Sequence, residues 1–313
     1  YGWQTLRIAL DWSPNTNHTP LFLARQAGLF EAAGLAVEFL DPTVSDYART
    51  PGRLVSAGEA DLGIGPSESV LSYADSPTPM VAVAALLQRD TSALLARGEV
   101  TRPRDLDGAR YASYAARLED AIVRELVVRD GGRGELHFSY PEKFRIWPQF
   151  LAGEVDLTWI FLGWEGLEVD LAPYRVFRLA EQGIPYGYTP VLFTRRDGLA
   201  GRASTVDALL ACCGEAARRL HADPGLAAGA LIDAVREPEL RREDFLVRSQ
   251  RFVRDDLLDA TGRWGTMEHD RWQAFVDWVA QRGIFELPGS VEALYRPASR
   301  GGAVAAGRSG SLP

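Results

Sequence analysis

Short apolar runs alternate with amphipathic segments through the first third of the chain. The predicted buried strands are residues 5–11, 37–40, 61–64 and 80–88. Residues 20–33 and 53–57 have the apolar spacing of helices, and Pro20 stands in a first turn, where its missing N–H costs nothing. Repeated alternation of strand and helix predicts a parallel sheet with helices on both faces.

The same alternation resumes after residue 101 and predicts a second α/β unit. Its expected elements are strands at 110–113, 136–138 and 155–161 and helices at 118–129 and 145–151. Residues 189–194 then have the pattern of a strand that crosses back to the first unit. We therefore predict an α/β fold of two lobes, with residues 1–98 and 191–298 in the first lobe and 99–190 in the second.

The last third of the chain is mostly helical in pattern. Ser204 is suited to cap the start of a helix, and a second helix is expected over residues 267–282. That helix places Trp272 and Phe275 on one face, which predicts packing in the core rather than contact with a ligand. Residues 299–313 are rich in Gly, Ala and Ser and are expected to be disordered.

Length and charge narrow the class of protein. A chain of 313 residues exceeds one ordinary core, in keeping with two lobes. The net charge of −8, with arginines scattered among acids, argues against a nucleic-acid partner. No apolar run approaches the roughly 18–20 residues of a membrane span, and no segment has the pattern of an export signal. Adjacent Cys212 and Cys213 are predicted to be packing residues rather than a disulfide.

Polar and aromatic residues gather where the chain leaves predicted strands. In α/β sheets, ligands bind beyond the carboxyl ends of the strands. The candidate ligand-binding residues are Trp12, Asn15, His18, Ser67, Glu68, Trp164, Glu165, Tyr186 and Tyr188. Their aromatic rings can stack on a planar ligand, and their polar groups can bind its edge. A purely structural interpretation stays open, in which Asn15 caps a helix, Trp12 packs on the sheet, and Glu68 stabilises a helix N-terminus.

Motifs of known enzymes are not found in the sequence. His18, His137, His221 and His269 lack the spacing of metal ligands, and the cysteines lack that of zinc or iron–sulfur sites. There is no G-x-S-x-G elbow, phosphate loop or G-x-G-x-x-G motif. A Ser, His and Asp triad stays open, because its members need not be close in sequence. We therefore expect no catalytic residue, no metal and no cofactor.

Residues 10–35, LDWSPNTNHTPLFLARQAGLFEAAGL, closely resemble the start of bacterial binding proteins for thiamine-pyrimidine precursors. These are relatives of the eukaryotic pyrimidine synthase of thiamine biosynthesis. Supporting motifs are EADLGIG at 59–65, GWEG at 163–166, GYTPVLFTRRD at 187–197 and RWGTMEHDRWQAFVDWV at 263–279. The resemblance implies a type II periplasmic-binding-protein fold, with a ligand cleft between two α/β lobes and hinges expected near residues 94–103 and 189–196.

The resemblance also implies a function. The expected ligand is a formylated or hydroxymethyl aminopyrimidine, sandwiched by aromatics and held by acids and amides, and the expected partner is the membrane permease of an ABC importer. We expect a monomer that acts outside the cytoplasm. Tyr186 and Tyr188 are separated by Gly187, whereas two adjacent tyrosines are typical of the pyrimidine binders. Riboflavin and a sulfonate therefore stay open as alternative ligands.

The synthase branch provides a contrast. It is similar in fold but carries a Lys that holds pyridoxal phosphate and a His that is consumed as substrate. The corresponding positions here resemble Gly65 and Ser69, and residues 193–195 stand where that branch has a cysteine-rich cluster. Without an amine at that position there is no Schiff base there, so an enzyme of pyrimidine synthesis is the less favoured alternative.

Overall fold

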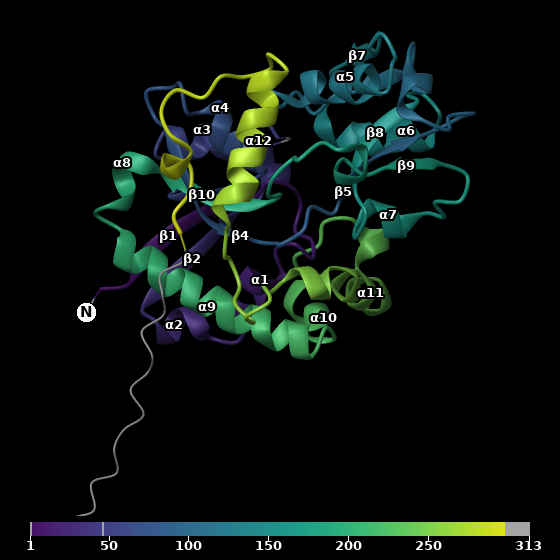
Figure 1. Ribbon diagram of the computed structural model, residues 1–313. Coiled ribbons are helices and arrows are strands. Elements are labelled where there is room, and N and C mark those ends of the chain that lie inside the picture. Colours follow the sequence, from purple (N-terminus) through teal and green to yellow (C-terminus); the bar gives the residue numbers. More distant parts are fainter. Residues whose placement is uncertain (1, 46, 298–313) are drawn as a thin grey trace, which may run out of the picture.

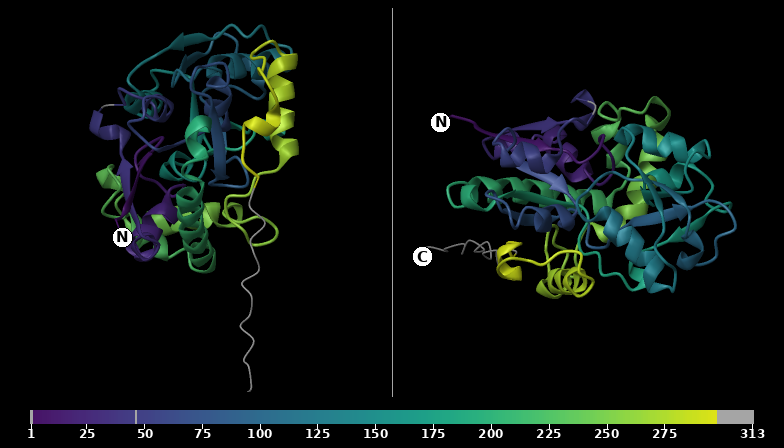
Figure 2. Two further views of the ribbon diagram at one scale, coloured as in Figure 1. Left: turned by 90° about the vertical axis from the view of Figure 1, so that its left-hand side faces the viewer. Right: turned by 90° about the horizontal axis from the view of Figure 1, so that it is seen from above.

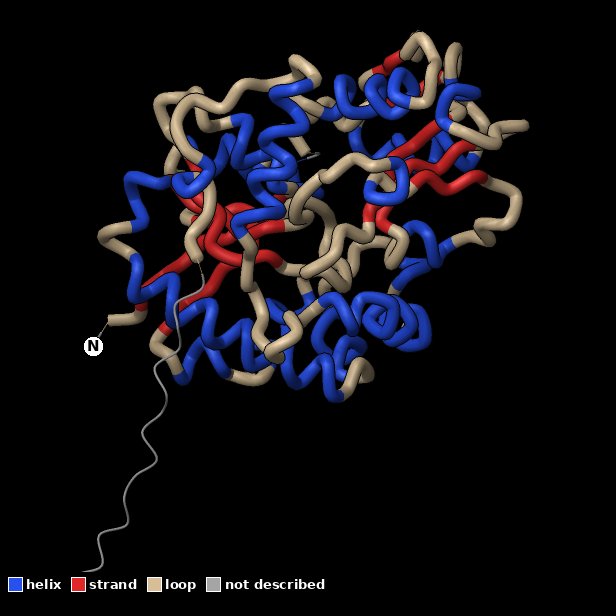
Figure 3. The backbone as a smooth tube through the Cα atoms, viewed as in Figure 1, coloured by secondary structure: helices blue, strands red, loops and turns tan. Residues whose placement is uncertain are grey.

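The computed structural model describes residues 2–45 and 47–297 and folds them into two α/β lobes (Figure 1). Each lobe is built on one five-stranded sheet. Figure 3 shows the strands in two separate groups with helices around each, and the view from above in Figure 2 shows the teal second lobe beside the first. The predicted α/β fold class is confirmed. The tail expected to be disordered lies outside the described residues.

The first sheet has the strand order β2-β1-β3-β10-β4. Its strands are β1 (Gln4–Ala9), β2 (Leu35–Leu40), β3 (Leu62–Gly65), β4 (Met80–Ala85) and β10 (Val191–Arg195). β1 pairs in parallel with β2 and β3, whereas β10 lies antiparallel between β3 and β4. Every residue of β4 is buried, as expected for an apolar strand covered on both faces.

The second sheet has the order β7-β6-β8-β5-β9. Its strands are β5 (Ser92–Ala96), β6 (Arg110–Ala112), β7 (His137–Ser139), β8 (Leu157–Phe161) and β9 (Arg175–Phe177). β6 pairs in parallel with β7 and β8, and β5 lies antiparallel to β8 and β9. In each sheet, therefore, the strand that arrives from the other lobe is inserted antiparallel to its neighbours.

Two crossovers join the lobes. Residues 86–91 lead from β4 to β5, and residues 178–190 lead from β9 to β10. The N–H of Leu86 donates to the carbonyl of Pro190 at 3.0 Å, so the crossovers lie side by side. The expected boundary after residue 98 and the expected hinge at 94–103 lie too late in the chain, because Ser92–Ala96 already pairs with β8 in the second sheet. Residues 189–196 fall mostly within β10 rather than within a flexible connection.

Helices cover both faces of the first sheet. The α-helices of both lobes together are α1 (Thr19–Gln26), α2 (Leu29–Ala32), α3 (Pro51–Ser56), α4 (Ser67–Ser72), α5 (Glu119–Arg129), α6 (Ile146–Leu151), α7 (Glu165–Glu168), α8 (Arg196–Leu199), α9 (Ala203–Ala222), α10 (Leu226–Leu231), α11 (Glu243–Val253) and α12 (His269–Gln281), of which α5, α6 and α7 follow strands of the second sheet. α1 and α9 share one core cluster with β1, and α3, α4 and α12 share another with β4 (Figure 1). Trp272 and Phe275 are buried in the second of these clusters, so the predicted core face of α12 is confirmed. Cys212 and Cys213 are buried in α9 and are not bonded to each other, as predicted.

Arg271, in the first turn of α12, holds both crossovers. Its guanidinium donates to the carbonyl of Gln88 in the first crossover and, at 2.9 Å, to the carbonyl of Gly187 in the second. The guanidinium carbon also lies 3.8 Å from the centroid of the Tyr188 ring. Because both carbonyls belong to the segments between the lobes, α12 is tied to the hinge region.

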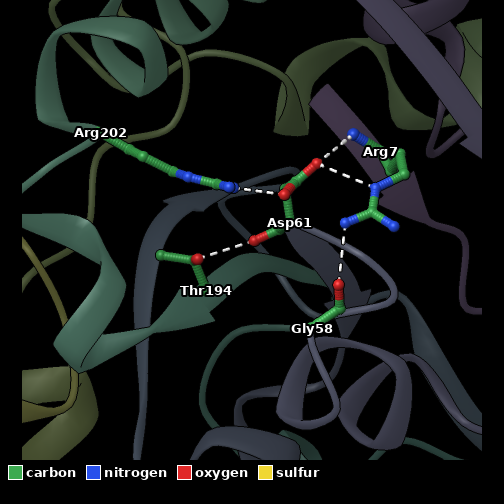
Figure 4. A network of polar contacts seen from close by, with 5 residues as sticks. All are labelled: Arg7, Gly58, Asp61, Thr194 and Arg202. Atoms are coloured by element: carbon green, nitrogen blue, oxygen red, sulfur yellow. Dashed lines mark hydrogen bonds and ion pairs between the residues drawn. The ribbon is translucent and has the colours of Figure 1, made fainter. Parts of the chain in front are cut away.

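Asp61 connects β1, β3, β10 and the start of α9 through polar contacts, at the end of these strands that lies away from the crossovers (Figure 4). Its carboxylate accepts a hydrogen bond from the backbone N–H of Arg7 at 2.7 Å and is paired with the guanidinium groups of Arg7 and Arg202. The hydroxyl of Thr194, in β10, donates to the Asp61 carbonyl at 2.8 Å. These charge-assisted contacts hold the pKa of the Asp61 carboxyl below its usual value despite partial burial, and they set the register that brings the far ends of β1, β3 and β10 together.

Candidate ligand-binding site between the lobes

A cavity of about 430 Å³ lies between the two lobes. Its first wall comes from the segments that follow β1, β2 and β3, and its second wall comes from the segments that follow β6, β7 and β8. Tyr186 and Thr189 of the second crossover close it at the back. The cavity thus lies beyond the carboxyl ends of the parallel strands of both sheets, where α/β folds bind ligands.

Aromatic rings from both lobes meet at one side of this cavity. Trp12 and Tyr47 come from the first lobe, and Tyr114 and Phe144 from the second. The Trp12 ring centroid lies 4.5 Å from that of Phe144, 5.4 Å from that of Tyr47 and 5.8 Å from that of Tyr114. Trp12 and Tyr47 also line the cavity. A planar ligand therefore has an indole and a phenol within reach for stacking.

Three glutamates also line the cavity: Glu68, Glu119 and Glu165. Glu68 accepts hydrogen bonds from the backbone N–H of Leu118 and the hydroxyl of Tyr186, each at 2.8 Å. Burial and the nearby charge of Glu119 raise the Glu68 pKa to about 7. Burial also raises the pKa of Glu165 to about 8, although its carboxyl accepts a hydrogen bond from the N–H of Phe161 at 3.1 Å. Near neutral pH Glu68 and Glu165 are therefore partly protonated, and their carboxyl groups can both donate and accept hydrogen bonds.

Glu119 has the most hydrogen-bond donors of the three glutamates. One of its oxygens accepts from the hydroxyl of Tyr111 at 2.6 Å, the hydroxyl of Ser113 at 3.1 Å and the N–H of Tyr114 at 2.9 Å. Burial raises the pKa of this carboxyl even so. Because Glu119 is the first residue of α5, its position is set by the end of β6 and the loop that follows it.

Cations lie on the same walls. The Arg117 guanidinium of the second lobe makes two hydrogen bonds of 2.8 Å to the Asp75 carboxylate of the first lobe. Lys143 extends its ammonium to 4.6 Å from the centroid of the Tyr47 ring, and Arg53 also lines the cavity. Arg117 and Lys143 thus contact the opposite lobe directly, and both contacts exist only when the lobes are close.

Four of the predicted site residues line the cavity: Trp12, Glu68, Glu165 and Tyr186. Asn15 and His18 do not. Asn15 donates from its side chain to the Ser13 carbonyl and accepts from the Asn17 N–H, so its role is structural, but it orders the turn before α1 and does not cap the helix, whose N-cap is His18. His18 is buried, and its Nδ1 accepts from the Asn15 N–H, which leaves Nε2 to donate to Asp11 at 2.7 Å. Asp11 lines the cavity, so His18 positions a residue of its wall.

The other three predicted residues also point elsewhere. Ser67 donates its N–H to the carbonyl of Tyr188 and its hydroxyl to the carbonyl of Tyr186, which fixes α4 to the second crossover. Trp164 packs against the ring of Phe245, because successive residues at a helix start point about 100° apart and Glu165 takes the cavity side. The hydroxyl of Tyr188 accepts from the N–H of Glu268 at 2.8 Å.

Gly187 explains why the side chains of Tyr186 and Tyr188 point to different places. Its φ of 87° lies in the left-handed region, which turns the chain between the two tyrosines. Tyr186 keeps its ring at the cavity, 5.1 Å from the Trp159 ring, while Tyr188 lies beneath Arg271. Of the candidate residues Trp12, Glu165 and Tyr188, only the first two therefore line the cavity.

Sequence reasoning missed several lining residues. Tyr114 and Glu119 follow β6, so the rule that ligands lie beyond strand ends could have found both. Tyr47 and Lys143 lie in long connections, and only the approach of the lobes brings them together. Residues 2–45 and 47–297 contain no group of three or more His, Cys, Asp or Glu side chains placed to hold a metal ion. Within the same described ranges, no helix combines the length and apolarity needed to cross a membrane.

Comparison with known proteins places the chain in a family. The model of the family described as NMT1/THI5 like matches residues 15–227. The chain belongs to this NMT1/THI5-like family. It is 21% identical over 293 residues to a formylaminopyrimidine-binding protein of Halalkalibacterium halodurans, and the match covers 91% of this chain and 87% of that protein.

Two further comparisons show the breadth of the resemblance. The chain is 32% identical over 212 residues to the 4-amino-5-hydroxymethyl-2-methylpyrimidine phosphate synthase THI11 of Saccharomyces cerevisiae, covering 66% of this chain and 56% of that protein. Among solved structures, the ligand-binding component of an ABC-type import system from Staphylococcus aureus superimposes with a TM-score of 0.68 at 13% identity, covering 94% of this chain and 97% of that one. The fold is therefore that of the periplasmic binding proteins, as the resemblance implied.

Proposed function

We propose that this protein is the solute-binding component of an ABC importer and captures an aminopyrimidine of the thiamine-precursor type, such as a formylaminopyrimidine or a hydroxymethylpyrimidine. One observation carries the proposal: Trp12 and Glu68 of the first lobe and Glu165 of the second line one cavity. Its volume of about 430 Å³ suits a small substituted ring. Family membership and the formylaminopyrimidine-binding relative support the same ligand class.

The protonation of the glutamates suits an aminopyrimidine edge. Such an edge presents an amine donor beside a ring-nitrogen acceptor. A protonated carboxyl can donate its O–H to the ring nitrogen while its carbonyl oxygen accepts from the amine. Glu165, with a pKa of about 8, holds this proton at neutral pH, and the residue lines the cavity.

The inter-lobe contacts suit a receptor that closes on its ligand. Arg117 and Asp75 pair across the lobes, and the Leu118 N–H of the second lobe donates to Glu68 of the first. In the proposed cycle the lobes hinge at residues 86–91 and 178–190, and the closed form docks on a membrane permease. The protein acts outside the cytoplasm, as a monomer, and has no catalytic residue.

A sulfonate fits the cavity less well. Without a ring, it would leave Trp12 and the hydrogen-bonding groups of the three glutamates without a partner. The enzyme alternative needs an amine that holds pyridoxal phosphate, and Lys143 is an amine in the cavity wall. We expect Lys143 to form no aldimine. A shift of the pyridoxal phosphate absorbance to longer wavelength in the presence of the protein, with Lys143 modified after borohydride reduction, would favour the enzyme instead.

The test is calorimetry with 4-amino-5-hydroxymethyl-2-methylpyrimidine and its formylaminomethyl analogue. We expect binding at micromolar concentration or below, about 8 kcal/mol or more. Trp12→Ala and Glu165→Ala should each weaken binding about 10-fold or more, because they remove a stacking face and a hydrogen-bonding edge. Trp3→Ala is the matched control, because Trp3 is 61% exposed and lies outside the cavity. No heat from either pyrimidine, or unchanged affinity in both cavity variants, would refute the proposal.

A further inference from the structure

Lys143 is the one lysine in a chain that has 33 arginines among its 34 basic residues of these two types. It lies in the short 3₁₀ turn Lys143–Arg145 of the second lobe and lines the cavity between the lobes. Everywhere else the chain uses arginine for its cations. The single compact ammonium therefore stands where a ligand would be enclosed, and it can form hydrogen bonds in three directions.

The Lys143 ammonium has no carboxylate within ion-pair distance among residues 2–45 and 47–297, and its one described contact is the face of the Tyr47 ring at 4.6 Å. The acid whose charge acts on it is Glu119, of which one oxygen already accepts three hydrogen bonds. A half-buried cation held only by an aromatic face is weakly compensated for its lost hydration. The site therefore has room for a stronger negative partner.

Arg53 adds a second positive charge to the same side. It lies on the first lobe, lines the cavity, and its charge acts on Lys143 by repulsion. Among the described residues its side chain has no carboxylate partner either. Two like charges brought from opposite lobes oppose closure unless an anion lies between them. The acids of the cavity are Asp11, Glu68, Glu119 and Glu165, so the lining offers a proton-bearing acidic edge and a basic pair within one enclosure.

We propose that Lys143, together with Arg53, determines specificity for an aminopyrimidine that carries an anionic oxygen substituent, such as a phosphate monoester, on the carbon arm of its ring. This inference rests on the proposed function, because the ring and its amine are assigned to Trp12 and the glutamates. The ammonium leaves the Tyr47 face or shares it with the anion, and the anion joins the two lobes through charge-assisted hydrogen bonds.

The experiment compares 4-amino-5-hydroxymethyl-2-methylpyrimidine with its phosphate ester by calorimetry. Wild-type protein should bind the ester about 10-fold or more tightly than the parent alcohol. Lys143→Met, which keeps the length of the side chain, should abolish that preference and leave affinity for the alcohol within about 3-fold. Lys143→Arg should retain part of the preference, and Arg282→Met, an exposed arginine outside the cavity, should retain all of it.

A second readout uses the fact that Lys143 is the one lysine. An amine-reactive acetylating reagent should modify Lys143 in the free protein, and mass spectrometry should show the modification slowed about 10-fold or more by the ester but not by the alcohol. Binding of the alcohol with no gain for the ester overturns the specificity assigned to Lys143 and leaves the proposed function standing. Binding of neither overturns both, and equal protection by both compounds overturns the role of the charge.

Discussion

Replacement of Glu165 by glutamine tests whether this buried acid costs stability for the sake of binding. Glu165 is 8% exposed, and burial raises its pKa from 4.5 to about 8. The folded protein thus holds this proton more tightly than the unfolded chain does. The free energy of unfolding falls as pH rises through this window, because the unfolded chain ionises near 4.5 while the folded one resists until about 8.

The size of the effect follows from the two pKa values. From 4.5 to about 8 is about 3.5 pH units, and at about 1.36 kcal/mol each the upper bound is about 5 kcal/mol. The cavity of about 430 Å³ can hold water, which solvates part of the charge. We therefore expect Glu165→Gln to stabilise the ligand-free protein by about 1–3 kcal/mol at about pH 8.5 and to change it little at about pH 4.5.

Urea unfolding of both proteins at the two pH values measures this difference. Every other titrating group is common to the two proteins and cancels in the comparison. The control is Glu154→Gln, since Glu154 is exposed and lies outside the cavity, and it should change stability by less than about 0.5 kcal/mol. A glutamine variant that is no more stable than wild type at the higher pH would refute the reasoning.

Three further outcomes are expected. Asp61→Asn should lower the free energy of unfolding by about 2–4 kcal/mol, measured in urea, because it leaves Arg7 and Arg202 without their partly buried partner (Figure 4); a change below about 0.5 kcal/mol would contradict this. Arg117→Ala should weaken ligand binding mainly by faster dissociation, measured by stopped flow, because it removes the inter-lobe pair with Asp75; faster association alone would not fit. Burial raises the pKa of Cys213, so a thiol reagent at about pH 8 should modify it only after unfolding, and rapid labelling of the native protein would contradict the packing described.

The fold could be predicted from the sequence because its signals are local. The buried run of β4 and the amphipathic face of α12 depend on neighbours three or four residues away at most. The boundary between the lobes was harder, because β5 is apolar like β4 and the sequence does not say with which sheet it pairs. Only its pairing with β8 and β9 assigns it to the second lobe.

The candidate site, too, could be predicted from the sequence only in part. Trp12, Glu68 and Glu165 follow strands, so the rule about strand ends found them. Whether a neighbour such as Trp164 or Tyr188 faces the same way depends on single backbone angles, such as the positive φ of Gly187, that composition does not reveal. Lys143 faces Tyr47 across 96 positions of sequence, and no local pattern connects them.

Arg271 makes the C-terminal helix part of the moving machinery. A carbonyl in each connection accepts from this one guanidinium, so neither connection can rotate its peptide planes without pulling on α12. When the lobes close about these connections, both connections must therefore move together with α12. Arg271 lies 84 positions after Gly187, so ending the chain before residue 269 would release both connections at once, although no residue that lines the cavity would be removed.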